Sequence, residues 1–346
     1  MSNGRSTIPA TLSKRRGVVP SGTEIAPELA LTHLAVAGAT SVRLRTRTGW
    51  QSWRKPSGCP GGPDGSTARP HLLIPANGVV DYQVRGEGVS VVELNTVDGP
   101  KRAVAAAEGT LPMGLPAKIA PKYLSRAAWG ADESYRFDST GAVKVPPTFF
   151  KTQTLTVHHS GEDVPVADQL AHVRGIYYTQ AITQDYGDIG YQLLIDSDGR
   201  VYEGCYSDPD AIPVFGPALT ADGLPQMVNG AHVGGFNAGN IGICLLGNFM
   251  NTRPTNTALS ALTIVLARLA ASAKLDPQGT TDYENPISGA AARIATIATH
   301  RDWHKANSAA GATLCPGDFL YGMMPVVRQA VAAKMRNLPA MSLPTG

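Results

Sequence analysis

The stretch Thr154-Leu155-Thr156-Val157-His158-His159-Ser160 indicates the fold class, because it joins a buried strand to two possible metal ligands. Its β-branched and apolar residues predict a strand over Thr154–His159. Neighbouring side chains of a strand point to opposite faces, so at most one of the two imidazoles faces a given site. The sequence therefore predicts one histidine available for chemistry at the end of this strand.

Strands and helices alternate on the carboxyl side of this stretch. Apolar residues at positions 166, 170, 173 and 177 recur at helical spacing. A hairpin over 191–203, an apolar strand over 240–246, a helix around 259–269 and a helix over 325–335 are expected to follow. We predict an α/β domain over residues 123–336, with a mixed central sheet flanked by helices.

The amino-terminal part has a different pattern. Residues 41–47 alternate between polar and apolar, and short apolar segments at 71–74, 79–84 and 89–94 are separated by turn residues. We predict a small, mostly antiparallel β domain over 23–100, preceded by a polar, flexible arm over 1–22. A Pro-rich linker is expected over 101–122, and residues 337–346 are expected to form a tail.

Composition excludes several classes of protein. The 346 residues are 43% hydrophobic and 16% charged, with a net charge of +3, which does not fit a coiled coil, a collagen or a disordered chain. So small a net charge gives no indication of a nucleic-acid-binding surface. No uncharged apolar run is long enough for a transmembrane helix. The basic cluster at 14–16 is followed by too short an apolar run for a conventional export signal.

Two later segments carry further metal-capable side chains. His300 lies in Thr299-His300-Arg301-Asp302, and Cys315 begins Cys315-Pro316-Gly317-Asp318. Two histidines and one cysteine would form a three-ligand zinc site that leaves a fourth position for water. Taken singly, each residue is more simply a packed core residue. The four cysteines are too sparse for a disulfide scaffold, and a Cys205–Cys244 disulfide cannot be inferred.

Together, these segments resemble the family of peptidoglycan recognition proteins and type 2 N-acetylmuramoyl-L-alanine amidases, which includes bacterial and phage lytic amidases. The resemblance covers residues 124–335. It rests on eight segments in the family's order: 124–130, 155–160, 188–195, 198–204, 231–237, 240–243, 300–302 and 315–318. Members that only bind muropeptide typically lack the cysteine, so Cys315 favours an enzyme.

By position, the resemblance implies zinc ligands at His158, His300 and Cys315. The loop between His300 and Cys315 is longer than in most relatives, and His304 becomes a rival ligand because it lies four residues after His300. His159 follows the first ligand along the strand and is expected to pack away from the metal.

The family's catalytic tyrosine falls on Tyr191, although a strand tyrosine can also be a core residue. Thr313 either bonds the oxyanion or caps the turn before the cysteine. His232 and Asn237 lie in a motif that lines the substrate groove in similar proteins. The same two side chains could instead stabilise their loop through hydrogen bonds.

The resemblance implies zinc-dependent hydrolysis of the amide between N-acetylmuramic acid and L-alanine, which is bacteriolytic degradation of the peptidoglycan cell wall. The alternative is a non-catalytic peptidoglycan-binding module, or a wall-anchoring component of a phage tail or injection device. Without an export signal, we expect synthesis in the cytoplasm and delivery by lysis, a phage particle, an injection device or another non-signal route. The N-terminal domain is a candidate for virion or injection-device assembly.

Overall fold

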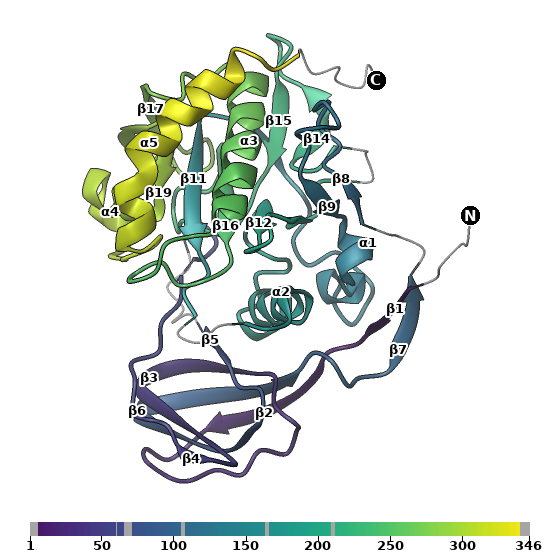
Figure 1. Cartoon of the computed structure of the whole chain (residues 1–346), viewed down its shortest axis with the longest axis vertical. Helices are drawn as coiled ribbons and strands as arrows, with labels where there is room; N and C mark the ends of the chain where they lie inside the picture. Colours follow the sequence, from purple (N-terminus) through teal and green to yellow (C-terminus); the bar gives the residue numbers. More distant parts are fainter. Residues whose placement is uncertain are drawn as a thin grey trace.

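The computed structural model describes residues 6–59, 61–65, 71–104, 108–162, 166–208 and 212–339 (Figure 1). The first elements of the chain are β1 (Ser6–Pro9), β2 (Leu12–Val18), β3 (His33–Thr46), β4 (Gly49–Trp50), β5 (Leu72–Pro75), β6 (Val79–Asn95), β7 (Lys101–Val104), β8 (Gly109–Thr110), β9 (Lys122–Leu124), α1 (Arg126–Trp129), η1 (Glu133–Arg136), β10 (Phe149–Lys151) and β11 (Thr154–His159). They are followed by α2 (Gln169–Tyr178), η2 (Thr179–Thr183), β12 (Leu193–Ile195), β13 (Val201–Glu203), β14 (Phe215–Leu219), β15 (Pro225–Val228), β16 (Asn240–Leu245), α3 (Asn256–Ser272), β17 (Thr280–Glu284), β18 (Ala291–Ala295), β19 (Ile297–Thr299), α4 (His300–Ala306), η3 (Ser308–Ala310) and α5 (Asp318–Met335).

A seven-stranded mixed sheet forms the centre of the carboxyl-terminal part, in the order β19-β11-β16-β12-β13-β9-β8. The pairs β19–β11, β11–β16, β16–β12 and β13–β9 are parallel, whereas β12–β13 and β8–β9 are antiparallel. The predicted mixed α/β fold is confirmed. The strand expected at 240–246 lies inside the sheet, where both of its faces are covered.

Helices cover the two faces of this sheet (Figure 1). Leu193 and Ile195 of β12 pack into one core with α3 and α5, whereas Leu194 between them packs into a second core with α2. Strand periodicity therefore separates the two faces residue by residue. Helix α5 begins earlier than the expected start at 325 and contains Pro325 within it, because Leu320 also packs into the core shared with α3.

The amino-terminal strands form an antiparallel sheet in the order β2-β6-β3-β4, with β5 paired to β3. It has its own apolar core, which includes Leu34, Val36, Leu44 and Val91. Whether this sheet folds as an independent domain stays a prediction. Among the described helices, none has the length and apolarity needed to cross a bilayer.

The expected flexible arm over 1–22 is wrong for residues 6–18. Strand β2 pairs with β6, and β1 pairs with β7, which lies within the expected linker. A polar strand at a sheet edge can bond through its backbone while its side chains face water, so composition alone did not reveal these strands. Residues 1–5, 105–107 and 340–346 lie outside the described residues.

The amino-terminal sheet packs against α2. His33 Nε2 lies 3.0 Å from His172 Nδ1, and both rings are buried. Arg174 donates to the carbonyl oxygen of Thr96 at 3.0 Å. The loop between β4 and β5 then runs from this sheet to the carboxyl end of β11, where the candidate site lies.

Candidate metal centre

His158 reaches the site because of its place in β11. The alternating side chains Leu155 and Val157 pack into the core under α3 and α5, so His158 points to the other face of the sheet. His159 points back and packs against Phe249, with ring centroids 6.2 Å apart. The structure therefore places one histidine of the pair at the site, as the strand periodicity predicts.

His300 is the first residue of α4 and follows directly on β19, the parallel neighbour of β11. The Asp302 carboxylate accepts hydrogen bonds from both the backbone N–H and the hydroxyl of Thr299, each at 2.9 Å, which fixes the start of the helix. Trp303 anchors the same helix to β11 by donating to the Thr156 hydroxyl at 2.8 Å. These contacts hold the His300 ring beside His158, with centroids 4.8 Å apart.

Cys315 completes the predicted ligand set. Its carbonyl oxygen accepts from the backbone N–H of Arg301 at 2.9 Å, and its own N–H donates to the Thr313 hydroxyl oxygen at 3.1 Å. Its Sγ lies 3.6 Å from His158 Nδ1. The loop between His300 and Cys315 thus returns to the site despite its length. Thr313 caps the turn, as one of its two predicted roles requires.

A fourth residue, Cys59, joins this cluster from the amino-terminal part. Its Sγ lies 3.2 Å from His158 Nδ1, 3.1 Å from His300 Nδ1 and 3.3 Å from Cys315 Sγ. The four ligand atoms lie within 4.8 Å of one another. Among the described residues, these four side chains form a group that could hold a metal ion. His304 is not part of this group, so the structure does not support it as the rival ligand.

Sequence reasoning missed Cys59, although a signal exists. The tripeptide Cys-Pro-Gly occurs twice, at 59–61 and at 315–317, and each copy is soon followed by an aspartate. The repeat pairs Cys59 with a predicted ligand. Cys205 and Cys244 are both free and buried in the core beside α2.

Hydrogen bonds set the tautomer of His158. His232 Nε2 lies 2.9 Å from the carbonyl oxygen of Asn240, so this nitrogen must carry a proton and donate it. His232 Nδ1 is then an acceptor, and it lies 3.0 Å from His158 Nε2. His158 therefore carries its proton on Nε2 and presents the lone pair of Nδ1 to the cluster. A hydrogen bond on the far nitrogen of a metal-binding histidine orients its ring in this way.

His232 and Asn237 make the loop contacts that one of their two predicted roles requires. Both side chains are fully buried. The Asn237 side-chain oxygen accepts from the backbone N–H groups of His232 and Val233, and its amide donates to the carbonyl oxygen of Gly62 and to Asp64. These bonds stabilise the loop, and substrate binding by the two residues stays a prediction. His232 also orients His158.

Tyr191 lies beside His158, with ring centroids 5.3 Å apart, and its side chain is buried. Burial, followed by the neighbouring Cys59 thiolate, raises the pKa of the Tyr191 phenol well above its ordinary value. The phenol therefore keeps its proton and can act as a hydrogen-bond donor. At Cys59, burial opposes the thiolate, but Cys315, His300 and His158 together lower the pKa of its thiol well below the ordinary value.

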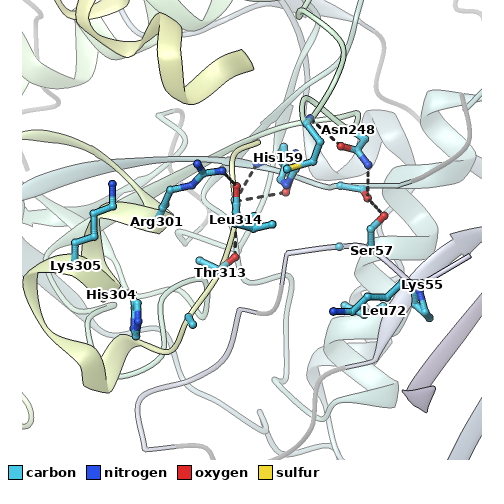
Figure 2. Close-up of a pocket in the computed structure, with 16 residues that line it drawn as sticks. Lys55, Ser57, Leu72, His159, Asn248, Arg301, His304, Lys305, Thr313 and Leu314 are labelled. Carbon is cyan, nitrogen blue, oxygen red and sulfur yellow. Dashed lines mark hydrogen bonds between the residues drawn. The ribbon is translucent and has the colours of Figure 1, made fainter. Parts of the chain in front are cut away.

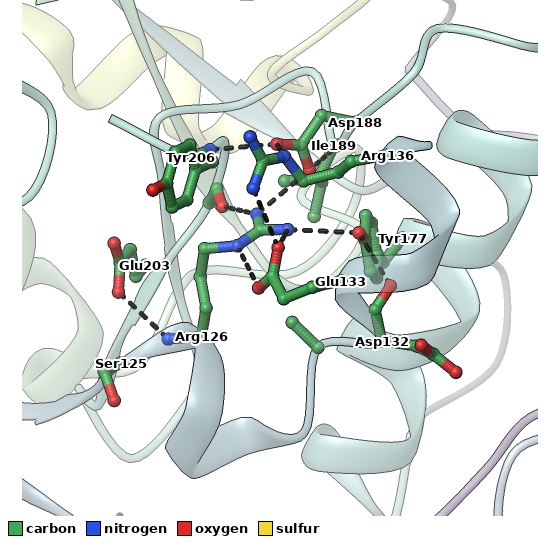
Figure 3. Close-up of polar contacts among 12 residues, drawn as sticks. Ser125, Arg126, Asp132, Glu133, Arg136, Tyr177, Asp188, Ile189, Glu203 and Tyr206 are labelled. Atoms are coloured by element: carbon green, nitrogen blue, oxygen red, sulfur yellow. Dashed lines mark hydrogen bonds and ion pairs between the residues drawn. The ribbon is translucent and has the colours of Figure 1, made fainter. Parts of the chain in front are cut away.

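A polar network surrounds the buried Arg126 guanidinium and includes Asp188, three residues before Tyr191 (Figure 3). Arg126 donates to Asp188 at 2.9 Å and to Glu133 at 2.8 and 3.1 Å, and it also donates to the Tyr177 hydroxyl at 3.1 Å. Burial raises the pKa of Asp188, and the Arg126 charge opposes that shift. The network ties segment 124–130 to segment 188–195, which carries the tyrosine.

A cavity of about 700 Å³ opens beside Cys315 (Figure 2). The loop that includes Lys55 forms one side, and Arg301, His304 and Lys305 of α4 line another. Thr313, Leu314 and His159 also line it. The described lining residues include cationic side chains and no aspartate or glutamate.

Fold and site together define a mixed α/β domain with a buried Cys/His cluster at the carboxyl ends of parallel strands. Residues 149–318 match the family model described as N-acetylmuramoyl-L-alanine amidase (Amidase_2), and these residues belong to that family. The predicted family is confirmed.

The chain is 25% identical to peptidoglycan recognition protein 3 of Homo sapiens over 247 residues, which are 68% of this chain and 62% of that protein. It is 30% identical to the N-acetylmuramoyl-L-alanine amidase of Homo sapiens over 159 residues, which are 45% of this chain and 23% of that protein. The chain thus spans less than two thirds of the length of these relatives. Among solved structures, the amidase LysC from Clostridium intestinale is similar at 17% identity, over 60% of this chain and 96% of that chain, with a TM-score of 0.35.

Proposed function

We propose that this protein is a zinc-dependent N-acetylmuramoyl-L-alanine amidase that hydrolyses the bond between the muramic lactyl group and the first L-alanine of the stem peptide. One observation carries the proposal: His158, His300 and Cys315, which come from three separate segments of an Amidase_2 domain, converge on one point. Imidazole nitrogen and thiolate sulfur are the donors that zinc prefers.

The donor set fits zinc in its chemistry as well as its position. The bond from His232 leaves His158 Nδ1 free to bind a cation. When bound, zinc lowers the pKa of a coordinated water to about 7 and polarises a carbonyl oxygen. Three protein ligands of this kind leave one position for that chemistry.

The remaining steps fall to side chains around the cluster. The protonated Tyr191 hydroxyl donates a hydrogen bond to the oxyanion that develops as water adds to the amide carbonyl. Arg126 acts at a distance, because its bonds to Asp188 hold the segment that leads to Tyr191. Thr313 holds the Cys315 turn, and its hydroxyl proton stays available for the substrate.

The cavity beside Cys315 suits the stem peptide of peptidoglycan. Stem peptides carry carboxylates, and the lining includes Lys55, Arg301 and Lys305. Opposite charges steer a ligand into a cleft and fix its orientation. We therefore assign this cavity to the peptide side of the scissile bond.

The test is a digest of purified sacculi and of soluble muropeptides by the zinc-loaded protein, with and without a chelator. Free stem peptides should be released only in the chelator-free sample, and Cys315→Ala should release none. His304→Ala is the matched control, because His304 lines the cavity but lies outside the cluster, and it should retain zinc. A zinc-loaded protein that binds sacculi but releases no peptide would establish a binding module instead.

A further inference from the structure

Residues 57–59 and 61–64, called the strap below, carry Cys59 into the cluster from outside the residues that match the family. We infer that Cys59 is a fourth protein ligand of the metal, so that the strap holds the enzyme in a closed, latent form. This inference rests on the proposed function, because it concerns the same metal. It adds a regulation that the three predicted ligands do not supply.

The distances of Cys59 Sγ from the other three donor atoms approach those of a single tetrahedral ion. With Zn–S near 2.3 Å and Zn–N near 2.0–2.1 Å, a tetrahedral site has S···N edges of about 3.6 Å and an S···S edge of about 3.8 Å. The corresponding separations from Cys59 are 3.1, 3.2 and 3.3 Å. A small outward shift of Cys59, together with a closing of the widest separation in the cluster, which is at most 4.8 Å, would accommodate the ion.

The environment of Cys59 differs from that of the other described free cysteines outside the cluster. Cys205 and Cys244 lie in an apolar core, as expected of small buried hydrophobes. Cys59 instead lies against two imidazole nitrogens and a second thiol, and it is partly exposed where His158, His300 and Cys315 are buried. It therefore occupies the solvent side of the cluster.

Contacts on the amidase domain hold the strap in place. The Tyr186 hydroxyl donates to the carbonyl oxygen of Gly61 at 2.7 Å, and Asn237 donates to that of Gly62 at 2.9 Å. Asp64 accepts from the side-chain amides of Asn237 and Asn285 at 2.7 and 2.9 Å. A Cβ on Gly61 would lie 2.9 Å from the Ala231 carbonyl oxygen, so only glycine allows this close approach.

The consequence follows from coordination number. A site with three protein ligands keeps a position for water, whereas two cysteines and two histidines make the closed arrangement of structural zinc sites. Cys59 loses its thiol proton to solvent when it binds the ion, and it occupies the position that hydrolysis requires. Because the strap also covers Asn237, its departure would open both the metal and the motif expected to line the substrate groove.

Zinc X-ray absorption on the full-length, zinc-loaded protein tests the ligation directly. We expect two sulfur neighbours near 2.3 Å in the wild-type protein and one in Cys59→Ala. Cys205→Ala is the matched control, because it removes a buried thiol that lies outside the cluster, and it should keep two. A single sulfur neighbour in the wild-type protein overturns the inference, whatever the behaviour of the variants.

Amidase rates then separate this inference from the proposed function. If the strap closes the site in about nine molecules of ten, Cys59→Ala should hydrolyse soluble muropeptides roughly tenfold faster than wild type. Two sulfur neighbours with an unchanged rate in Cys59→Ala would refute latency. Two sulfur neighbours in the wild-type protein, with no hydrolysis by either protein, would support Cys59 as a ligand and refute the proposed amidase activity. One sulfur neighbour in the wild-type protein, together with rapid hydrolysis, would refute Cys59 as a ligand and support the amidase activity.

Discussion

His232 should control how tightly the protein binds zinc, although it is not a ligand. His232→Leu fills this buried position with an apolar side chain and removes both ring nitrogens. In the wild type, His158 Nε2 donates to His232 at 3.0 Å, and His232 donates to the Asn240 carbonyl oxygen at 2.9 Å. In the variant, His158 Nε2–H loses its acceptor and the Asn240 carbonyl oxygen loses its donor. His158 can consequently adopt the other tautomer and protonate the nitrogen that should face the metal.

The magnitude follows from these two lost contacts. Loss of the hydrogen-bond partner of a metal-binding histidine typically lowers metal affinity by about 10- to 100-fold, or roughly 1.4–2.8 kcal/mol. Each buried group left unpaired also costs about 1–3 kcal/mol of folding stability, which should appear in the metal-free protein as well. The zinc affinity of the variant should therefore fall by more than its lower folding stability explains.

The assay is competition for zinc against a chromophoric chelator at fixed pH, with circular dichroism to confirm folding. His159→Leu is the matched control, since His159 is the neighbouring buried histidine, and its ring accepts from Phe249 on the other face of the strand. That control should bind zinc nearly as tightly as wild type. If His232→Leu is folded and binds zinc with wild-type affinity, the tautomer argument is wrong.

Three further outcomes are expected. Tyr191→Phe should retain zinc and lose roughly 10²–10³-fold in turnover, because it removes one oxyanion donor, and full activity would return Tyr191 to the core. Burial, then the charges of His172 and Arg174, depress the pKa of His33, so the unfolded chain binds more protons than the folded one below pH 6.5. Stability should be greatest above that pH and fall on acidification by up to roughly 1.4 kcal/mol per pH unit, and denaturant melts should give a shallower slope for His33→Gln. Leu262→Ala, in the fully buried face of α3, should lower unfolding free energy by about 2–5 kcal/mol, measured by urea titration, and a smaller loss would mean that the core collapses into the gap.

The sequence by itself determined the mixed α/β architecture, and its resemblance to the amidase family implied three of the clustered residues. The architecture depends on signals that are local in the chain. Alternation placed His158 and His159 on opposite faces of β11, and helical spacing marked the buried faces of α2 and α3. Such periodicities reflect which side chains a strand or helix can bury, so they survive in the sequence without knowledge of the partner.

Edges and hydrogen-bond partners were not determined in this way. Strand β2 exists because the edge of β6 offers backbone groups to pair with, and a polar sequence at an edge carries no apolar period. His232 belonged to a recognised motif, but its position against His158 depends on how the β15–β16 connection folds over the sheet. Its role as an orienting residue therefore appeared only in the structure.

Cys59 is the clearest case of a residue that tertiary structure alone placed. It lies 99 positions before His158 and 256 before Cys315, in a loop without periodicity. The sequence around Cys59 resembles that of the Cys315 turn, but this resemblance does not determine the position of the loop in the fold. The packing of the amino-terminal sheet on α2 and the contacts of the strap bring its sulfur to the cluster, because non-local contacts depend on the whole fold and not on neighbouring residues.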